Sequence, residues 1–200
     1  MKMIYAVLGI LLFGGLAFYL TSCKNKSQGQ AEQRPDTTTR QKVDPNNNPY
    51  HDLRNLAFSA TEEQIGVQLP SEQTKIYGVI MDWDLGEGTA TLVAFLSGDA
   101  SLYLSSGGGV IGGGGHENVK QAVFAFIDKA ETYLNKTVKT ETTPLPELDG
   151  VKFYFLTNKG KFVGQEMIQN FENESSDWLD LFEEGNKVIS EIRISTPGDI

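Results

Sequence analysis

The sequence feature most able to do chemistry is a glycine run at residues 107–115, in which seven of nine residues are glycine. A predicted β-strand precedes the run, and His116 and a predicted helix follow it. A glycine-rich turn from a strand into a helix can present free backbone N–H groups and the positive end of the helix dipole to an anion. The residues that could line such a cradle are Ser106, Gly107, Gly108, Gly109, Gly112, Gly113 and His116.

The spacing within this glycine loop fits the known phosphate-binding motifs only in part. Gly107, Gly109 and Gly112 have the spacing of the dinucleotide-binding motif, but their strand is predicted to lie in an antiparallel hairpin and no acidic residue ends a second parallel strand. The run also lacks the Gly-Lys-Ser or Gly-Lys-Thr of a P-loop. Because glycine tolerates close approach, structural packing, a mobile flap and the docking of a protein or peptide remain alternatives to an anion cradle.

The two histidines add little further chemistry. His116 begins a helix, where a positive charge is disfavoured, so it is expected to be neutral and able to donate to a ligand in the loop. The alternative is a first-turn residue with no ligand. His51 is expected to be a solvated surface residue. Neither a cysteine pair nor a His-x-x-x-His spacing occurs, so no metal site and no cofactor is predicted.

Hydroxyl and acidic side chains have weaker claims to a site. A catalytic triad can be drawn on paper from Ser105 or Ser106, His116, and Asp82 or Asp84. The Gly-x-Ser-x-Gly turn that usually exposes such a serine is missing, and triads are recognised by geometry rather than spacing. Asp82, Asp84 and Glu87 also cluster at a predicted turn, where solvated carboxylates are usual and weak calcium binding is the alternative.

Cys23, the only cysteine, follows an uncharged run at residues 3–20. Eighteen helical residues reach about 27 Å, close to the hydrocarbon thickness of a bilayer. The segment Leu20-Thr21-Ser22-Cys23 resembles the lipobox of bacterial lipoproteins, in which an aliphatic and two small residues precede the cysteine. This resemblance implies cleavage before Cys23, acylation of its thiol (for example by palmitate), and a membrane-anchored protein of the cell envelope, periplasmic or on the cell surface.

An uncleaved transmembrane helix is the alternative reading of residues 1–23. Lys24, Lys26, Arg34 and Arg40 lie just after the run, and the positive-inside rule would place that flank and the following domain in the cytoplasm. Residues 24–49 contain one aliphatic side chain larger than alanine, Val43, and are otherwise rich in Gln, Asn, Thr, Pro and Lys. Such a segment cannot bury enough surface to offset its chain entropy, so a disordered polar tether is predicted there.

Residues 50–200 are predicted to form a single globular domain with a strongly acidic surface. They hold 23 acidic and 11 basic residues, a net charge of −12. Such a surface repels phosphate backbones, and no stripe of basic and aromatic residues interrupts it, so nucleic-acid binding is not expected. Net charge otherwise reports on solubility rather than on the chemistry of a site.

Periodicity within this domain predicts an α+β fold. A helical preamble at residues 50–70 carries Leu53, Leu56 and Ala57 on one face and a capping box of Thr61 with Gln64. The main predicted elements are strands at 75–83, 89–97 and 100–106, a helix at 117–134, strands at 151–158 and 161–166, and a helix from a Ser175–Ser176 cap to Pro197.

The predicted order β-β-β-α-β-β-α gives a five-stranded, mostly antiparallel sheet with helices packed on it. At the level of fold this order resembles profilin-like or roadblock-like domains, which implies nothing firm about function. The string SLYLSSGGGVIGGGGH, which ends at His116, with Pro144-Leu145-Pro146 and residues 151–158, also resembles a family of uncharacterised bacterial proteins over roughly residues 61–193. That resemblance implies no activity, cofactor or catalytic residue.

These features together predict a membrane-tethered, non-catalytic binding or interaction domain. A protein partner could dock at the glycine loop, or on the less covered face of the sheet that carries Tyr103, Lys152 and Tyr154. The alternative is an enzyme or nucleotide-binding protein that uses the loop at 107–115 as an oxyanion or phosphate cradle with help from His116. A purely structural envelope component is a third possibility.

Overall fold

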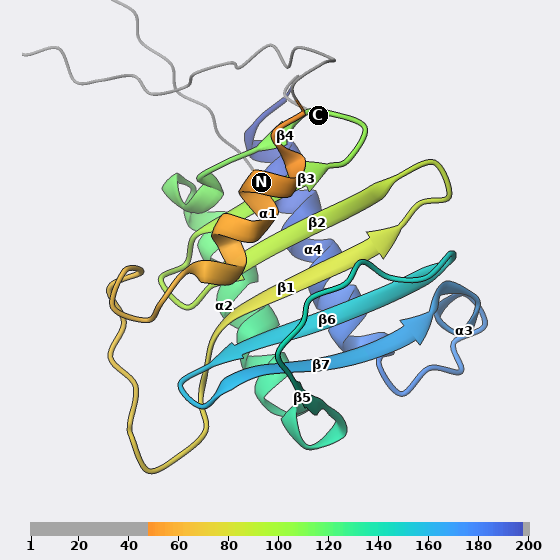
Figure 1. Ribbon diagram of the computed structural model, residues 1–200. Helices are drawn as coiled ribbons and strands as arrows, with labels where there is room; N and C mark the ends of the chain where they lie inside the picture. Colours follow the sequence, from red (N-terminus) through yellow and green to blue (C-terminus); the bar gives the residue numbers. More distant parts are fainter. Residues whose placement is uncertain (1–47, 198–200) are drawn as a thin grey trace, which may run out of the picture. The chain divides into compact units, whose positions relative to one another are not determined.

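The fold is built on one seven-stranded sheet whose strands lie in the order β4-β3-β2-β1-β6-β7-β5 (Figure 1). The computed structural model describes residues 48–197. Each pair of neighbouring strands in this sheet is antiparallel. The strands are β1 (Ile76–Asp84), β2 (Thr89–Phe95), β3 (Ala100–Leu104), β4 (Gly109–Val110), β5 (Val138–Thr140), β6 (Gly150–Thr157) and β7 (Gly160–Met167).

Helices cover both faces of this sheet. α2 (Glu117–Glu131) and α4 (Leu179–Ser195) pack against each other on one face, and α1 (Tyr50–Ser59) crosses the opposite face (Figure 1). Two 3₁₀ turns, η1 (Gly113–Gly115) and η2 (Leu134–Lys136), flank α2. The short helix α3 (Ile168–Glu172) follows β7 directly.

The alternation of side chains along the strands divides the core into two layers. Val79, Met81 and Phe153 point into the larger layer, which α2 and α4 close. Ile80, Val93, Tyr154 and their neighbours point into the smaller layer beneath α1. The central strands are therefore buried on both faces, which explains why the sequences of β1 and β6 are nearly continuous apolar runs.

The α+β class, the antiparallel sheet and the packed helices agree with the sequence prediction, but the number of strands does not. The sheet has seven strands, not five, because β4 and β5 add two short edge strands to β3 and β7. β4 is two residues long and includes Gly109, and β5 is three residues long and mostly exposed, so neither has a readable hydrophobic period. α3 was also missed, because five residues are too short for a helical pattern.

The first helix buries a different face from the one predicted. Leu53 is half-buried and Ala57 buried, but the side chain of Leu56 is 67% exposed, and α1 instead turns Tyr50 and Arg54 toward the sheet. The apolar spacing was misleading because a charged residue of α1 finds a buried partner on the sheet. The capping box after this helix is confirmed: the Thr61 N–H donates to Gln64 Oε1 at 2.9 Å, and the Gln64 N–H to Thr61 Oγ1 at 3.3 Å.

Candidate functional site

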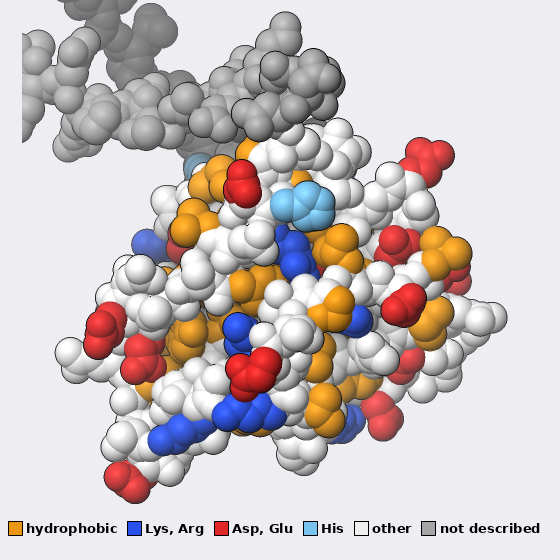
Figure 2. All heavy atoms as spheres, in the orientation of Figure 1, with side chains coloured by type: hydrophobic (Ala, Val, Ile, Leu, Met, Phe, Trp, Pro, Cys, Tyr) orange, Lys and Arg blue, Asp and Glu red, His pale blue; other side chains and the backbone are white. Residues whose placement is uncertain are grey.

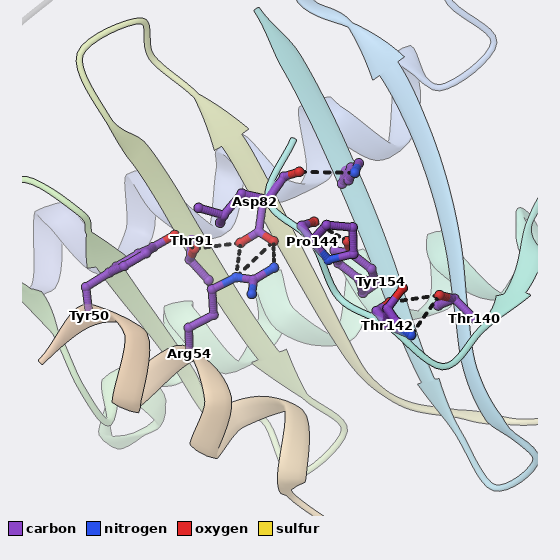
Figure 3. A network of polar contacts seen from close by, with 10 residues as sticks. Tyr50, Arg54, Asp82, Thr91, Thr140, Thr142, Pro144 and Tyr154 are labelled. Carbon is purple, nitrogen blue, oxygen red and sulfur yellow. Dashed lines mark hydrogen bonds and ion pairs between the residues drawn. The ribbon is translucent and has the colours of Figure 1, made fainter. Parts of the chain in front are cut away.

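A buried network of polar side chains lies between α1 and the sheet (Figure 3). Arg54 of α1 donates from Nη2 to Asp82 Oδ2 at 2.5 Å and from Nε to both carboxylate oxygens at 3.1 and 3.2 Å. The side chains of Arg54 and Asp82 are 6% and 0% exposed. A bidentate arginine–carboxylate pair of this kind is strong and fixes orientation, so it positions α1 on the sheet.

Two hydroxyl groups extend the network from the carboxylate of Asp82. Thr91 lies opposite Asp82 in the sheet, and its Oγ1 donates to Asp82 Oδ1 at 2.6 Å. Because that bond uses the only proton of the threonine hydroxyl, the Tyr50 hydroxyl must be the donor in its own 2.8 Å contact with Thr91 Oγ1. Tyr50 and Arg54, from successive turns of α1, are therefore both joined to one carboxylate, Tyr50 through the Thr91 hydroxyl and Arg54 directly.

Aromatic rings enclose the guanidinium of Arg54. Its central carbon lies 4.7 Å from the ring centroid of Phe58 and 5.9 Å from that of Tyr154. Burial by itself would lower the pKa of Arg54, but the hydrogen bonds and charge of Asp82 outweigh it and raise that pKa. Burial, together with the negative charge of Asp82, raises the pKa of Tyr154 to about 12. Both Arg54 and Tyr154 therefore keep their protons throughout the physiological range.

A loop between β5 and β6 continues the cover over the same face. The Tyr154 hydroxyl donates to the Pro144 carbonyl at 2.5 Å, and Lys152 Nζ donates to the Leu145 carbonyl at 3.1 Å. This face was predicted to be the less covered one and able to dock a protein partner. In the described residues, α1 and this loop occupy it, and Tyr103, Lys152 and Tyr154 are all buried.

The outer surface above this network is chemically mixed. Figure 2 shows hydrophobic, basic and acidic side chains of the described residues interspersed on the face that carries α1. No group of three or more His, Cys, Asp or Glu side chains within residues 48–197 is arranged to hold a metal ion. Within residues 48–197, both carboxylate oxygens of Asp82 accept hydrogen bonds from Arg54 and Thr91, so the network fastens α1 to the sheet.

The structure places the glycine loop along the end of β3. Gly107, Gly108, Gly109 and Gly112 have positive φ angles, which side chains rarely adopt. A Cβ on Gly109 would lie 2.2 Å from the Leu102 carbonyl oxygen, so only glycine allows this backbone approach. Gly113 is buried, and a Cβ there would lie 3.2 Å from the Ala100 carbonyl oxygen. Glycine at these two positions therefore allows the loop backbone to pack closely against β3.

Several N–H groups of this glycine loop already have partners within the domain. The Gly114 N–H donates to Asp99 Oδ1 at 3.0 Å, and the Gly112 N–H donates to Ser101 Oγ at 3.3 Å. The Gly107 N–H donates to the Leu104 carbonyl at 2.9 Å. A carboxylate therefore occupies one of the positions at which an external anion would bind. The geometry favours the structural role of the glycines, and a ligand at Ser106–His116 stays a prediction.

The structure does not bring the residues of the hypothetical triad together. Asp82 lies beneath α1 and is saturated by Arg54 and Thr91, whereas His116 is exposed at the start of α2, which lies on the opposite face of the sheet. Ser106 is exposed in the turn after β3, and Ser105 Oγ accepts the Thr89 N–H at 2.7 Å.

The acidic cluster predicted at the β1–β2 turn is wrong for Asp82. β1 continues through Asp84, so Asp82 lies within a strand and is fully buried. Asp84 is the last residue of β1, next to the turn, and its Oδ1 accepts the N–H groups of Gly86 and Asp149 at 3.0 and 3.2 Å. Glu87 is exposed, as a solvated turn residue would be.

A groove of about 660 Å³ opens on the other side of the domain, between α3, α4 and the end of β1. Its floor consists of five apolar residues: Trp83, Ile168, Phe171, Leu179 and Phe182. Phe182 stacks on Phe171 with ring centroids 4.2 Å apart and meets Trp83 edge-on at 5.3 Å. Pockets of this volume that are lined by hydrophobic and aromatic side chains are typical of binding sites.

α3 forms one side of this groove, and Glu166 holds that helix in place. Its carboxylate accepts the Met167 N–H and the Asn170 side-chain amide at 2.8 and 2.7 Å, and the Ser176 hydroxyl at 3.0 Å. Burial by itself would raise the pKa of Glu166, but these hydrogen bonds outweigh it and lower that pKa. The carboxylate is thus ionised at neutral pH and fixes the turns on both sides of α3.

Charged side chains rim the polar part of the groove. Glu172 comes from α3 and Glu183 and Glu191 come from α4, together with Lys187, whose Nζ pairs with Glu184 outside the groove at 2.7 Å. Glu191 accepts a hydrogen bond from Asn118 at 2.6 Å. No ion pair joins Glu172 or Glu183 to another residue of the described part of the chain. The rim is therefore acidic.

Neither the polar network nor the groove is predicted from the sequence. A carboxylate inside a strand that is apolar on both faces must have a buried partner, and this was a usable signal for Asp82. The sequence alone does not say which of the 11 basic residues of the domain supplies it. The groove requires residues 83, 168–172 and 179–191 to meet, and only the tertiary fold brings them together.

The N-terminal predictions, including acylation of Cys23, concern residues outside the described part of the chain. Within residues 48–197, every helix is too short or too polar to cross a bilayer. Comparison of the chain with protein-family models, with curated proteins and with solved structures gave no significant match.

Proposed function

We propose that this chain is a membrane-tethered interaction domain without catalytic activity of its own. The observation that carries the proposal is the groove between α3 and α4, which combines an aromatic floor with a charged rim. Exposed apolar hollows rimmed by polar residues usually mark sites where a partner binds. The glycine loop supports the proposal less, because its backbone groups are partly used within the domain.

The attachment of α1 fits a tethered domain. The chain enters at Asn48, whose side-chain amide donates to the Ser105 carbonyl at 2.6 Å, and α1 begins two residues later. The buried Arg54–Asp82 pair then fastens this first helix to the centre of the sheet. Tension on the N-terminal segment would thus be borne by the sheet as well as by α1. We propose that the anchor itself is a lipid on Cys23, in the cell envelope.

The anchor and the interaction are tested separately. Labelled palmitate should be incorporated into the full-length chain and lost on Cys23→Ala, and the labelled chain should require detergent for extraction from membranes. Chemical cross-linking in intact cells should join the wild-type chain to a discrete partner.

The competing use as an anion or nucleotide site is tested by a thermal-shift screen of the full-length chain with nucleotides, sugar phosphates and carboxylates. The proposal expects no saturable stabilisation. A hit that is lost on His116→Ala, and retained in the matched surface variant His51→Ala, would replace the interaction domain with a ligand-binding or catalytic one. Gly109→Val is unsuited to this test, because any side chain there collides with the Leu102 carbonyl.

A further inference from the structure

We infer that the groove between α3 and α4 binds a basic, amphipathic polypeptide segment of a partner protein. This inference rests on the proposed function and names the chemistry of the partner. The two halves of the groove differ: the apolar floor lies at the start of α4, and the polar rim continues along the same face of that helix to Glu191. A matching ligand needs apolar side chains at one end and cationic side chains beside them.

The floor selects apolar side chains. Trp83 and Leu179 are half-buried, so each keeps part of its surface open to solvent, while Phe171 and Phe182 behind them are buried. Trp83 is held by its edge-on contact with Phe182 and offers an indole on which an aliphatic or cationic side chain can pack. A rigid floor loses little entropy on binding, which favours affinity.

The rim selects positive charge. Three glutamates face the groove against one lysine, and that lysine is already paired with Glu184. Glu172 and Glu183 are both exposed and, within the described residues, free of ion pairs, so a lysine or arginine of a partner can approach them without displacing a cation of the domain. Complementary charge of this kind sets specificity and the rate of association more than affinity.

The other candidate occupants fit less well. A second copy of this domain carries a net charge of −12 and would be repelled by an acidic rim. Anionic lipid headgroups would be repelled for the same reason. Within the chain itself, residues 24–49 are basic but have one aliphatic side chain larger than alanine, and residues 3–20 are apolar but uncharged, so neither combines the two properties.

From Leu179 to Glu191 the groove follows α4 for about 18 Å, the length of roughly 12 helical residues.

The test is a binding titration with the full-length chain in neutral detergent. The probe is a fluorescent 12-residue peptide of leucine and lysine at helical spacing, and its binding to micelles alone is subtracted. Saturable binding is expected. It should weaken roughly 3- to 10-fold in Glu172→Gln/Glu183→Gln, since exposed charge pairs are individually weak, and the remaining binding should be less sensitive to salt. Binding should weaken at least about 10-fold in Leu179→Ser, which removes an apolar side chain from the floor of the groove.

Matched controls separate the groove from the general surface. Glu63→Gln/Glu87→Gln makes the same charge change at exposed sites elsewhere, and Ile194→Ser makes the same change in polarity on the exposed end of α4. Both controls should bind the peptide as the wild type does. Circular dichroism confirms that each variant is folded.

Three results would overturn the inference. The first is equal binding by the groove variants and the wild type, and the second is equal affinity for a leucine–glutamate peptide. The third is a concentration-dependent dimer, lost on Leu179→Ser, which would show that a second copy fills the groove. If the peptide fails but cellular cross-linking still yields a partner, the interaction domain stands and the partner uses another surface. If both fail, the proposed function fails as well.

Discussion

The contact between Arg54 and Asp82 allows the sharpest prediction about stability. Asp82→Asn keeps the size of the side chain and its ability to accept from Thr91, but it leaves the guanidinium of Arg54 buried without a counter-charge. Removing one partner of a buried ion pair costs about 3–5 kcal/mol. For a domain of this size each kcal/mol shifts the melting temperature by about 2–4 °C, so a fall of roughly 6–20 °C is expected.

The assay is urea unfolding of the full-length chain in mild detergent, followed by tryptophan fluorescence. Glu87→Gln, an exposed carboxylate in the turn after β1, is the control and should change the free energy of unfolding by less than about 0.5 kcal/mol. The double variant Arg54→Met/Asp82→Leu should be more stable than either single variant, because two apolar residues can replace a buried pair at little cost.

Amide hydrogen exchange then shows which part of the domain loses stability. Asp82→Asn should reduce protection throughout α1, since that helix holds the other half of the pair. A loss below about 1 kcal/mol together with unchanged protection in α1 would mean that the network does not hold the helix on the sheet.

Three further predictions follow from the same structure. Gly109→Ala should lower the free energy of unfolding by about 2–4 kcal/mol, because its Cβ would collide with the Leu102 carbonyl at a positive φ. Gly108→Ala also has a positive φ but open space around it, so it should lower that free energy by only about 1–2 kcal/mol. Similar urea midpoints for the two variants would contradict this. The raised pKa of Tyr154, about 12 against 10 when unfolded, means that the folded state holds this proton to higher pH, so the contribution of Tyr154 to stability should be constant below about pH 9 and be lost between about pH 10 and pH 12, and the fall in stability over that range should be less steep in Tyr154→Phe; an unchanged slope would exclude this tyrosine as the cause. Cys23→Ala removes both the acylation site and the lipobox cysteine before which cleavage is predicted, so palmitate labelling should be lost while the uncleaved apolar run of residues 3–20 keeps the chain in the membrane; palmitate labelling of the variant equal to that of the wild type would exclude Cys23 as the acylated residue.

The sequence predicted the elements with strong periods and missed what depends on tertiary contact. The buried stripe of α2, formed by Val119, Val123, Phe126, Ile127 and Ala130, agrees with its 3.6-residue pattern, and the hairpin of β6 and β7 lies within a residue of its prediction. These elements are fixed locally by apolar spacing and turn residues.

The misses share a physical cause. Leu56 was assigned to the core and Arg54 was not. The spacing of apolar residues indicates an amphipathic helix, but it does not show that the carboxylate of Asp82, in a strand far along the chain, pairs with Arg54. The short strands β4 and β5 form because β3 and β7 offer them open edges, not because their own sequences favour a strand. The glycine loop is unusual in its composition, but the sequence does not show that Gly109 packs against the backbone of β3 at Leu102.

The most direct test of the tethered interaction domain is site-specific photo-cross-linking of the full-length chain in the cells that make it. A photoreactive residue in place of Asn186 lies in the groove, and one in place of Ile194 lies at the exposed end of the same helix. A discrete protein adduct is expected from position 186; it should disappear with Leu179→Ser and be absent from position 194. Equal adducts from both positions, or none from position 186, would contradict this expectation.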